Sequence, residues 1–127
     1  MQVLIADDQR DVRSALRLLL EHQAEDCIII EAADSESLLA DAAQRSPDII
    51  IIDAELKGIL LKNDPQSVRS FQNVIAELRV LCPDARIVAL TSRPDLHKLT
   101  EGSRVDVLIS KADPPEALLD AIQKLCC

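Results

Sequence analysis

The chain has 127 residues, 48% of them hydrophobic, which suits a single globular domain with its own core and excludes a disordered tail. A formal net charge of −8 argues against a nucleic-acid-binding surface, because phosphate binding needs clustered Lys and Arg. No apolar run approaches the roughly 20 residues that span a bilayer, and the first residues lack the layout of a signal peptide, so we expect a cytoplasmic protein with no membrane segment.

Strand and helix signals alternate along the first half of the chain. Residues 3–6 predict a short buried strand, and apolar residues at helical spacing over 12–20 predict a helix after it. The arginines expected on the outer side of this helix are Arg10, Arg13 and Arg17. Residues 27–30 predict a second strand, and Asp34 or Ser35 is expected to cap a second helix. The side chains expected to point inward from that helix are Leu38, Leu39 and either Ala42 or Ala43.

The most informative stretch is the run of four isoleucines at 49–52, which ends at Asp53. β-Branched side chains favour an extended backbone. A strand that is apolar at every position, rather than at every second one, suits burial on both faces in a parallel sheet. An ionised carboxylate at the end of so apolar a strand is costly unless something there uses it, so Asp53 is the first functional candidate.

The second half of the chain continues the same alternation. Asp64-Pro65 predicts the start of a long helix that Pro83 ends. The apolar face of this helix is expected to consist of Val68, Phe71, Ile75, Leu78 and Leu81. The remaining predicted elements are a strand over 87–90, a short helix from Arg93-Pro94 to near Gly102, a strand over 105–109 and a last helix capped by Asp113-Pro114.

Five strand–helix units with short connections predict a single α/β domain over residues 1–127. Alternation of this kind gives parallel strands, right-handed crossovers and helices on both faces. We therefore expect a doubly wound five-stranded parallel sheet with the strand order 2-1-3-4-5.

The cysteines are expected to be free, reduced thiols. Cys27 and Cys82 lie in or beside apolar segments, as small buried hydrophobic residues do, and Cys126 and Cys127 are the last two residues. The sequence has no CxxC pair and no His at ligand spacing, so we expect no zinc site. Intermolecular oxidation through the terminal pair is the alternative.

Polar side chains follow four of the five predicted strands. They are Asp7 and Asp8 after the first strand, Asp53 after the third, Thr91 after the fourth and Lys111 after the fifth. In the predicted order these groups lie along one edge of the sheet, where neighbouring carboxylates need a raised pKa or a cation. Oxygen ligands suit Mg²⁺, and a hydroxyl and an ammonium opposite the metal would complete a cradle for a phosphoryl group. Each residue alone has a structural explanation, as a helix cap or a solvated charge, so the prediction depends on their joint occurrence.

At these residues the chain resembles the receiver domains of bacterial two-component response regulators, over essentially its full length. The segments that carry the resemblance are VLIADDQRDVRSALRLLLE, IIIIDAELKG, IVALTS and VLISKADPPEAL. The first segment is most similar to receivers of the subgroup that often precedes a LuxR-type helix-turn-helix domain. The resemblance implies a flavodoxin-like receiver fold.

The resemblance also implies a role for each strand-end residue. Asp53 would take a phosphoryl group from a histidine kinase or a phosphotransfer protein. Asp8 would bind Mg²⁺ directly and Asp7 directly or through water, with Asp53 and the backbone carbonyl of Glu55 as further ligands. Lys111 would pair with one phosphoryl oxygen and the Thr91 hydroxyl would donate to another. The domain would be a phosphoacceptor rather than an enzyme, with a possible homodimer and no nucleic acid bound by this chain.

The sequence departs from the family pattern in the loop after Asp53 and at Leu108. Lys57 stands where proline is common, and the loop is longer than usual, with residues 59–63 as the extra length. Leu108 stands where many receivers carry the aromatic residue that moves on activation.

Glu55 and Arg93 are placed to form an ion pair over the acceptor, although two solvated charges are an equal alternative.

Two other functions remain open from the sequence. A pseudo-receiver would keep the fold as a phosphorylation-independent interaction module; Leu108 and the altered loop favour it, and the complete set of acidic, hydroxyl and lysine residues does not. A flavodoxin-like carrier would need a Ser/Thr/Gly-rich phosphate loop after the first strand. The segment ADDQRD at that position is acidic instead and would repel an anionic cofactor.

Overall fold

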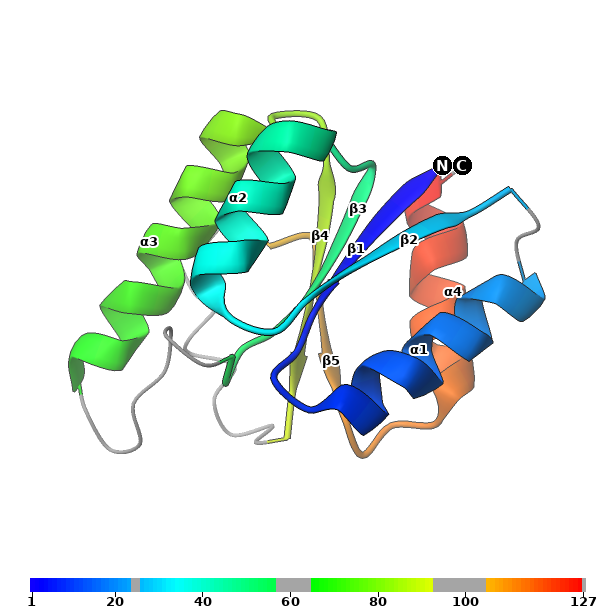
Figure 1. Ribbon diagram of the computed structural model, residues 1–127. Helices are drawn as coiled ribbons and strands as arrows, with labels where there is room; N and C mark the ends of the chain where they lie inside the picture. Colours follow the sequence, from blue (N-terminus) through cyan, green and yellow to red (C-terminus); the bar gives the residue numbers. More distant parts are fainter. Residues whose placement is uncertain (24–25, 57–64, 93–104, 127) are drawn as a thin grey trace.

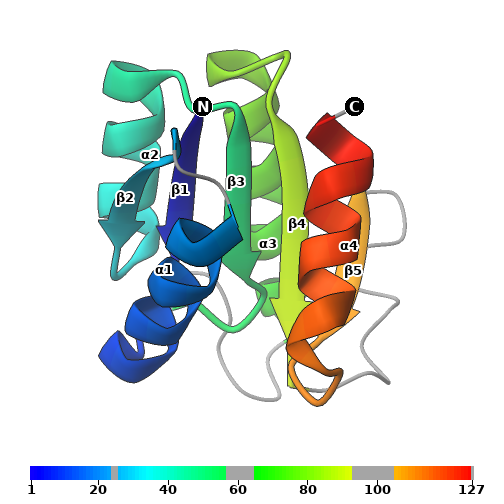
Figure 2. The same cartoon turned by 90° about the vertical axis from the view of Figure 1, so that its right-hand side faces the viewer.

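The computed structural model describes residues 1–23, 26–56, 65–92 and 105–126 and has a five-stranded parallel sheet at its centre (Figures 1 and 2). The strands are β1 (Gln2–Ala6), β2 (Ile28–Ala32), β3 (Ile49–Asp53), β4 (Arg86–Thr91) and β5 (Val107–Ser110). Their order across the sheet is β2-β1-β3-β4-β5, and every neighbouring pair is parallel. The predicted fold class and strand order are therefore confirmed.

Within the described ranges, two helices cover each face of this sheet. They are α1 (Arg10–Gln23), α2 (Ser35–Arg45), α3 (Pro65–Leu81) and α4 (Pro115–Cys126). Helices α2 and α3 cover one face, and α1 and α4 cover the other (Figures 1 and 2). Among the described residues no helix is both long enough and apolar enough to cross a membrane.

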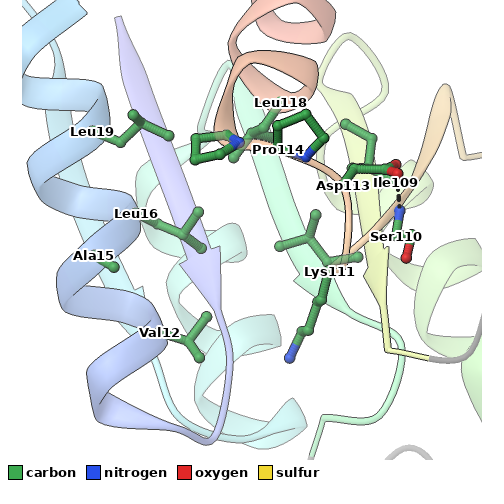
Figure 3. Close-up of a pocket in the computed structure, with 12 residues that line it drawn as sticks. Val12, Ala15, Leu16, Leu19, Ile109, Ser110, Lys111, Asp113, Pro114 and Leu118 are labelled. Atoms are coloured by element: carbon green, nitrogen blue, oxygen red, sulfur yellow. Dashed lines mark hydrogen bonds between the residues drawn. The ribbon is translucent and has the colours of Figure 1, made fainter.

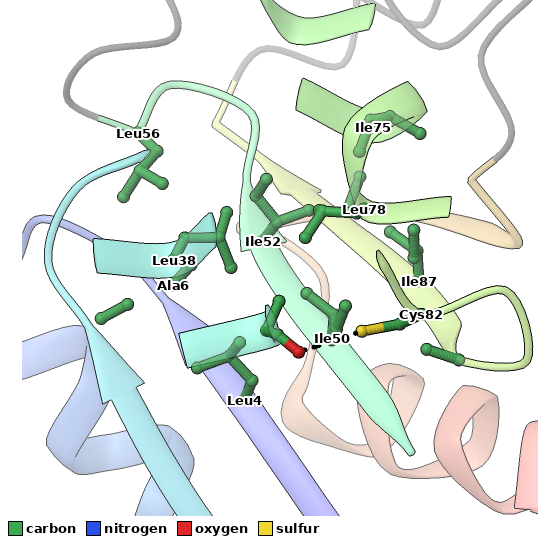
Figure 4. Close-up of a cluster of buried hydrophobic side chains, with 14 of the residues drawn as sticks. Leu4, Ala6, Leu38, Ile50, Ile52, Leu56, Ile75, Leu78, Cys82 and Ile87 are labelled. Carbon is green, nitrogen blue, oxygen red and sulfur yellow. Dashed lines mark hydrogen bonds between the residues drawn. The ribbon is translucent and has the colours of Figure 1, made fainter. Parts of the chain in front are cut away.

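The isoleucine strand β3 lies at the middle of the sheet and contributes to both layers of the core. Ile50 and Ile52 pack in the cluster beneath α2 and α3 (Figure 4). The same cluster contains Phe71, the only aromatic residue in the sequence. Ile49 and Ile51 pack in the cluster beneath α1 and α4. All four are at most 1% exposed, and burial of each side chain contributes about 1.5–3 kcal/mol to folding. Because both faces are covered, the strand tolerates no polar residue before its last position.

Helix α2 begins and ends with local capping contacts. The side chain of Asp34, and not that of Ser35, caps the N-terminus, since its carboxylate accepts the backbone N–H of Ser37 at 2.8 Å. At the other end Ser46 adopts a left-handed conformation with φ 47°, and its N–H donates to the Ala42 carbonyl. Ala42 is buried and Ala43 is exposed, which settles which alanine points inward.

Three expectations about helix surfaces and ends are wrong. Arg13 and Arg17 do not lie on the outer side of α1, because both turn towards Glu31 on β2; only Arg10 is exposed. Leu81 is 40% exposed at the end of α3 instead of buried. Asp113 does not cap the last helix: α4 begins at Pro115, and the Asp113 carboxylate accepts the backbone N–H of Ser110.

Several predictions concern residues outside the described part of the chain. They are the cap at Asp64, the loop from Lys57 through 59–63, the short helix after Arg93 and the terminal Cys127. Cys82 is buried and Cys27 is half-buried, and neither forms a disulfide bond within the described part of the chain.

Candidate functional site

The carboxyl ends of β1 and β3 bring three aspartates together. The two strands are neighbours, with Ala6 paired to Ile52, so the next residues along each strand lie side by side. Asp7, Asp8 and Asp53 each offer a carboxylate oxygen, and these atoms all lie within 4.8 Å of one another. Asp7 and Asp53 are 1% and 3% exposed, whereas Asp8 is exposed. The predicted acidic cluster is therefore present.

Lys111 brings a cation into this cluster from the far side of β4. Its backbone N–H donates to the Thr91 carbonyl at 2.7 Å, which fixes the start of its side chain beside the end of β4. Its Nζ then lies 3.0 Å from Asp7 Oδ2 and 3.1 Å from Asp53 Oδ2. One ammonium thus serves two buried carboxylates, and among the described residues the cluster has three carboxylates, with that of Asp8, to one ammonium.

The pKa values of the site record this imbalance. Burial raises the pKa of Asp53, and the Asp7 carboxylate adds to that rise; the Glu55 N–H and the Lys111 ammonium oppose it without cancelling it. Burial alone would lower the pKa of Lys111, but the carboxylates of Asp53 and Asp7 outweigh it and hold that pKa above its ordinary value. At Asp53 the effect of burial therefore outweighs that of the Lys111 ammonium.

A tight turn places the residues after Asp53 over its carboxylate. The Glu55 N–H donates to Asp53 Oδ1 at 3.0 Å, and the Leu56 N–H donates to the Asp53 carbonyl at 3.0 Å. Leu56 is fully buried and holds the turn against the core (Figure 4). The Glu55 side chain accepts a hydrogen bond from Ser92 Oγ at 2.7 Å, and its suggested partner Arg93 lies outside the described residues.

Thr91 ends β4 at the same edge of the sheet. It is 2% exposed, and it follows Leu90, the residue paired with Asp53 across the sheet. All five predicted strand-end side chains therefore come from the same edge. The turn at residues 53–56 brings the Glu55 backbone N–H to the Asp53 carboxylate at this edge.

Three residues of the site were missed from the sequence: Gln9, Arg13 and Ser92. The Gln9 N–H donates to Asp7 Oδ1 at 2.8 Å, a contact that an aspartate two residues earlier can signal. Arg13 Nη1 donates to the Asp7 carbonyl at 2.7 Å. Helical spacing places Arg13 among polar residues, and no local pattern indicates that it turns back to the strand end.

A groove of about 280 Å³ runs beside Lys111, between α1 and the segment that joins β5 to α4 (Figure 3). Aliphatic side chains of α1, including Val12, Leu16 and Leu19, form one wall, and Pro114 and Leu118 lie on the other. Val12 and the Lys111 ammonium lie near one another at one end of the groove (Figure 3). Most of the lining is apolar, and the polar side chains beside Lys111 are those of Ser110 and Asp113.

The arrangement can perform a narrow range of chemistry. Hard oxygen ligands with surplus negative charge suit a divalent cation such as Mg²⁺ or Ca²⁺. The Asp53 carboxylate is held by a backbone N–H and by an ammonium, and a carboxylate is one of the groups that can serve as a nucleophile.

Comparison with known proteins agrees with this geometry. Residues 3–123 match the family model described as the response regulator receiver domain. The transcriptional regulatory protein YxjL of Bacillus subtilis is 28% identical over 97% of this chain and 53% of its own length. The nitrate/nitrite response regulator protein NarP of Escherichia coli is 30% identical over 96% of this chain and 53% of its own length. The chain thus spans about half the length of the curated relatives it matches.

Solved structures extend the comparison to the site. A response regulator from Burkholderia pseudomallei, solved with a phosphorylated aspartic acid, a calcium ion and citrate, has a TM-score of 0.75 and 26% identity over 96% of this chain and 66% of its own. TrrA from Thermotoga maritima, solved in complex with Mg²⁺-BeF, has a TM-score of 0.77 and 25% identity over 98% of this chain and 97% of its own. A LuxR-family response regulator from Staphylococcus aureus, at 22% identity and a TM-score of 0.78 over 98% of this chain and 97% of its own, shares the fold.

Proposed function

Because this chain belongs to the response regulator receiver domain family and is a signalling phosphoacceptor rather than a classical enzyme, we propose that Asp53 is the residue that accepts the phosphoryl group. The observation that carries the proposal is the convergence of Asp7, Asp8 and Asp53 with a single Lys111. A buried cluster with surplus negative charge is costly for folding, and binding a cation beside an incoming phosphoryl group relieves that cost.

The proposed reaction is phosphoryl transfer to the Asp53 carboxylate. An Asp53 oxygen forms a bond to phosphorus while the bond between phosphorus and the donor nitrogen of a phosphohistidine breaks, and the leaving imidazole keeps that electron pair. Lys111 already holds Asp53 Oδ2 at 3.1 Å, so it orients the nucleophile and can then pair with a phosphoryl oxygen. The Thr91 hydroxyl, at the end of the adjacent strand, is the proposed donor to a second phosphoryl oxygen.

Mg²⁺ is the proposed cofactor, and the donor set fits it. Three carboxylate oxygens within 4.8 Å, two of them on buried residues, form an oxygen-only site with room for water on the exposed Asp8 side. Asp7, Asp8, Asp53 and the backbone carbonyl of Glu55 are the proposed ligands. When bound, the ion neutralises charge on the transferring phosphoryl oxygens.

The proposed phosphodonor is a sensor histidine kinase or a phosphotransfer protein, as the receiver family implies. We further propose that residues 1–127 form one receiver domain that binds no nucleic acid itself and can form a homodimer. The curated relatives are regulators of which this chain spans about half, which is consistent with a receiver that controls a separate output.

The alternative is a pseudo-receiver that binds a partner without phosphorylation. The observation in its favour is Leu108, which is partly buried against the α2–α3 core cluster at a position where the family often has a mobile aromatic residue. An intact acceptor site argues against it.

Incubation with acetyl phosphate and Mg²⁺, followed by intact mass measurement, tests the proposed function. We expect the gain of one phosphoryl group, absent from an Asp53→Asn variant. Asp48→Asn is the matched control, because Asp48 lies just before the opposite end of β3, where its carboxylate accepts the Gln2 N–H at 2.8 Å. Absence of a mass gain in the wild-type protein would favour the pseudo-receiver.

A further inference from the structure

Asp7 has all of its hydrogen-bonding groups engaged, which sets it apart from the exposed Asp8 beside it. Its N–H donates to the Ala32 carbonyl at 3.1 Å and so extends the pairing of β1 with β2 by one residue. Its Oδ1 accepts the Gln9 N–H and its Oδ2 accepts Lys111 Nζ. Its carbonyl accepts Arg13 Nη1 at 2.7 Å. The orientation of the Asp7 carboxylate is therefore set by hydrogen bonds to the Asp7 backbone as well as by hydrogen bonds to the two carboxylate oxygens.

Arg13 reaches the strand end because a carboxylate on the edge strand holds it there. Its Nε lies 3.1 Å from Glu31 Oε1, and the two side chains are only 15% and 29% exposed. Glu31 is paired in register with Ile5, two residues before Asp7. The guanidinium thus contacts β2 through one nitrogen and the end of β1 through another.

Arg17 provides a natural comparison, since it binds the same carboxylate without touching the site. Its Nη2 lies 2.8 Å from Glu31 Oε2, and the same nitrogen donates to the Ile29 carbonyl at 3.2 Å, further from the aspartates along β2. Glu31 is consequently held by two arginines, and the two guanidinium charges together outweigh burial and lower its pKa. The two arginines differ in which backbone carbonyl they reach.

From this geometry we propose that Arg13 is a positioning residue for the divalent-cation site: it clamps the Asp7 backbone to β2 through Glu31 and so fixes the Asp7 carboxylate for metal binding. The inference rests on the proposed function. Magnesium requires near-ideal octahedral geometry, so a small rotation of one ligand weakens binding. Groups that orient metal ligands typically change metal affinity 10–100-fold when they are removed. Lysine cannot replace Arg13, because only the planar guanidinium presents separate donors to Glu31 and to the Asp7 carbonyl at a fixed angle.

The test is the Mg²⁺ dissociation constant of the full chain, measured by titration calorimetry with Mg²⁺ alone. We expect Arg13→Ala and Arg13→Lys to raise it by about tenfold. Arg17→Ala, the matched control, should leave it within about twofold although it loses the same Glu31 contact. An equal weakening by Arg17→Ala, or an unchanged value in Arg13→Lys, would overturn the proposal.

Two further readouts separate positioning from loss of folding. In acetyl phosphate reactions the Mg²⁺ concentration for half-maximal rate should rise in Arg13→Lys, while the rate at saturating Mg²⁺ stays close to that of the wild type. Without metal, the Gln9 amide should exchange with deuterium faster in Arg13→Lys than in Arg17→Ala, because its acceptor Asp7 Oδ1 is less well held. Should Arg13→Ala not fold, the lysine variant carries the test alone.

Failure of the proposed function gives a different result. A wild-type chain that neither binds Mg²⁺ nor gains a phosphoryl group refutes the phosphoacceptor assignment. A wild-type chain that does both, together with an Arg13→Lys variant of unchanged Mg²⁺ affinity, refutes only the role of Arg13.

Discussion

The sheet carries a cluster of charged side chains at each end, and the two clusters have opposite charge ratios. At the carboxyl ends of the strands, Asp7 and Asp53 share Lys111. At the amino ends, the carboxylate of Asp106 lies 2.8 Å from Arg79 Nη2 and 3.8 Å from Arg86 Nη1, and it also accepts the Ile87 N–H.

The pKa values of the two acids move in opposite directions for this reason. Burial tends to raise both, but at Asp106 the Ile87 N–H and the two arginines outweigh it and hold the pKa below its ordinary value. At Asp53 burial outweighs the single lysine, and the pKa is raised. The direction of each pKa shift therefore follows the ratio of carboxylates to cations around the acid.

Removing the cation of the carboxyl-end cluster is expected to have the largest effect on stability. In Lys111→Met two buried carboxylates lose their partner, so the free energy of unfolding at pH 7 should fall by about 2–3 kcal/mol in chemical denaturation. The deficit should shrink as the pH falls through the raised pKa of Asp53, because the folded protein then binds a proton there. The exposed Lys124→Met is the control. A deficit that does not change with pH would show that packing, and not charge, is lost.

In the wild type the stabilisation that Lys111 provides is lost at high pH rather than at low pH. Since its pKa in the folded chain is raised, its stabilisation is complete below the ordinary lysine pKa and is lost as the pH rises through the folded value. Loss of stability on the alkaline side should therefore be smaller in Lys111→Met than in the wild type.

Neutralising one acid in each cluster should change stability with opposite signs. Asp106→Asn leaves Arg79 and Arg86 without their carboxylate, so unfolding free energy should fall by about 2 kcal/mol. Asp53→Asn removes a charge that folding disfavours, so the unfolding free energy should rise, and phosphorylation should be abolished. Thermal and urea unfolding at pH 7 measure both. Two changes of the same sign would contradict the charge-ratio argument.

Magnesium should stabilise the chain through the carboxyl-end cluster alone. At ten times its dissociation constant, the ion should add about 1.4 kcal/mol to the unfolding free energy by mass action. The increment should vanish in Asp8→Asn, which keeps the buried Asp7–Lys111–Asp53 contacts, and persist in Asp106→Asn. Persistence of the full increment in Asp8→Asn would exclude Asp8 as a ligand.

The smallest expected effect concerns Glu31, which like Asp106 is one carboxylate between two arginines. Glu31→Gln should cost about 0.5–1 kcal/mol at pH 7, because the pair is partly exposed. The pKa of Glu31 is lowered, so its stabilisation is present above the ordinary glutamate pKa and is lost as the pH falls through the folded value. Below that value wild type and variant should converge. Glu21→Gln, which touches only Arg17 at 3.5 Å, should change nothing measurable.

Local chemistry in the sequence determined the layers of this protein and the edge at which its function lies. Four consecutive isoleucines required a strand covered on both faces, and the βα alternation then gave the sheet order that places Asp7, Asp53, Thr91 and Lys111 together. Such features can be predicted because side-chain periodicity and strand-end position are properties of short segments.

Only the tertiary structure decided which charges meet. Helical spacing put Arg13 among polar residues, yet it lies between Glu31, 18 positions away in sequence, and the carbonyl of Asp7. Lys111 could be predicted to lie near the aspartates, but not to be shared between Asp7 and Asp53 from 104 and 58 positions away. Contacts of this kind depend on the distances between strand ends and on burial. Burial strengthens the attraction between opposite charges and disfavours the charged form of a group that has no partner. Both the distances and the burial exist only once the sheet has formed.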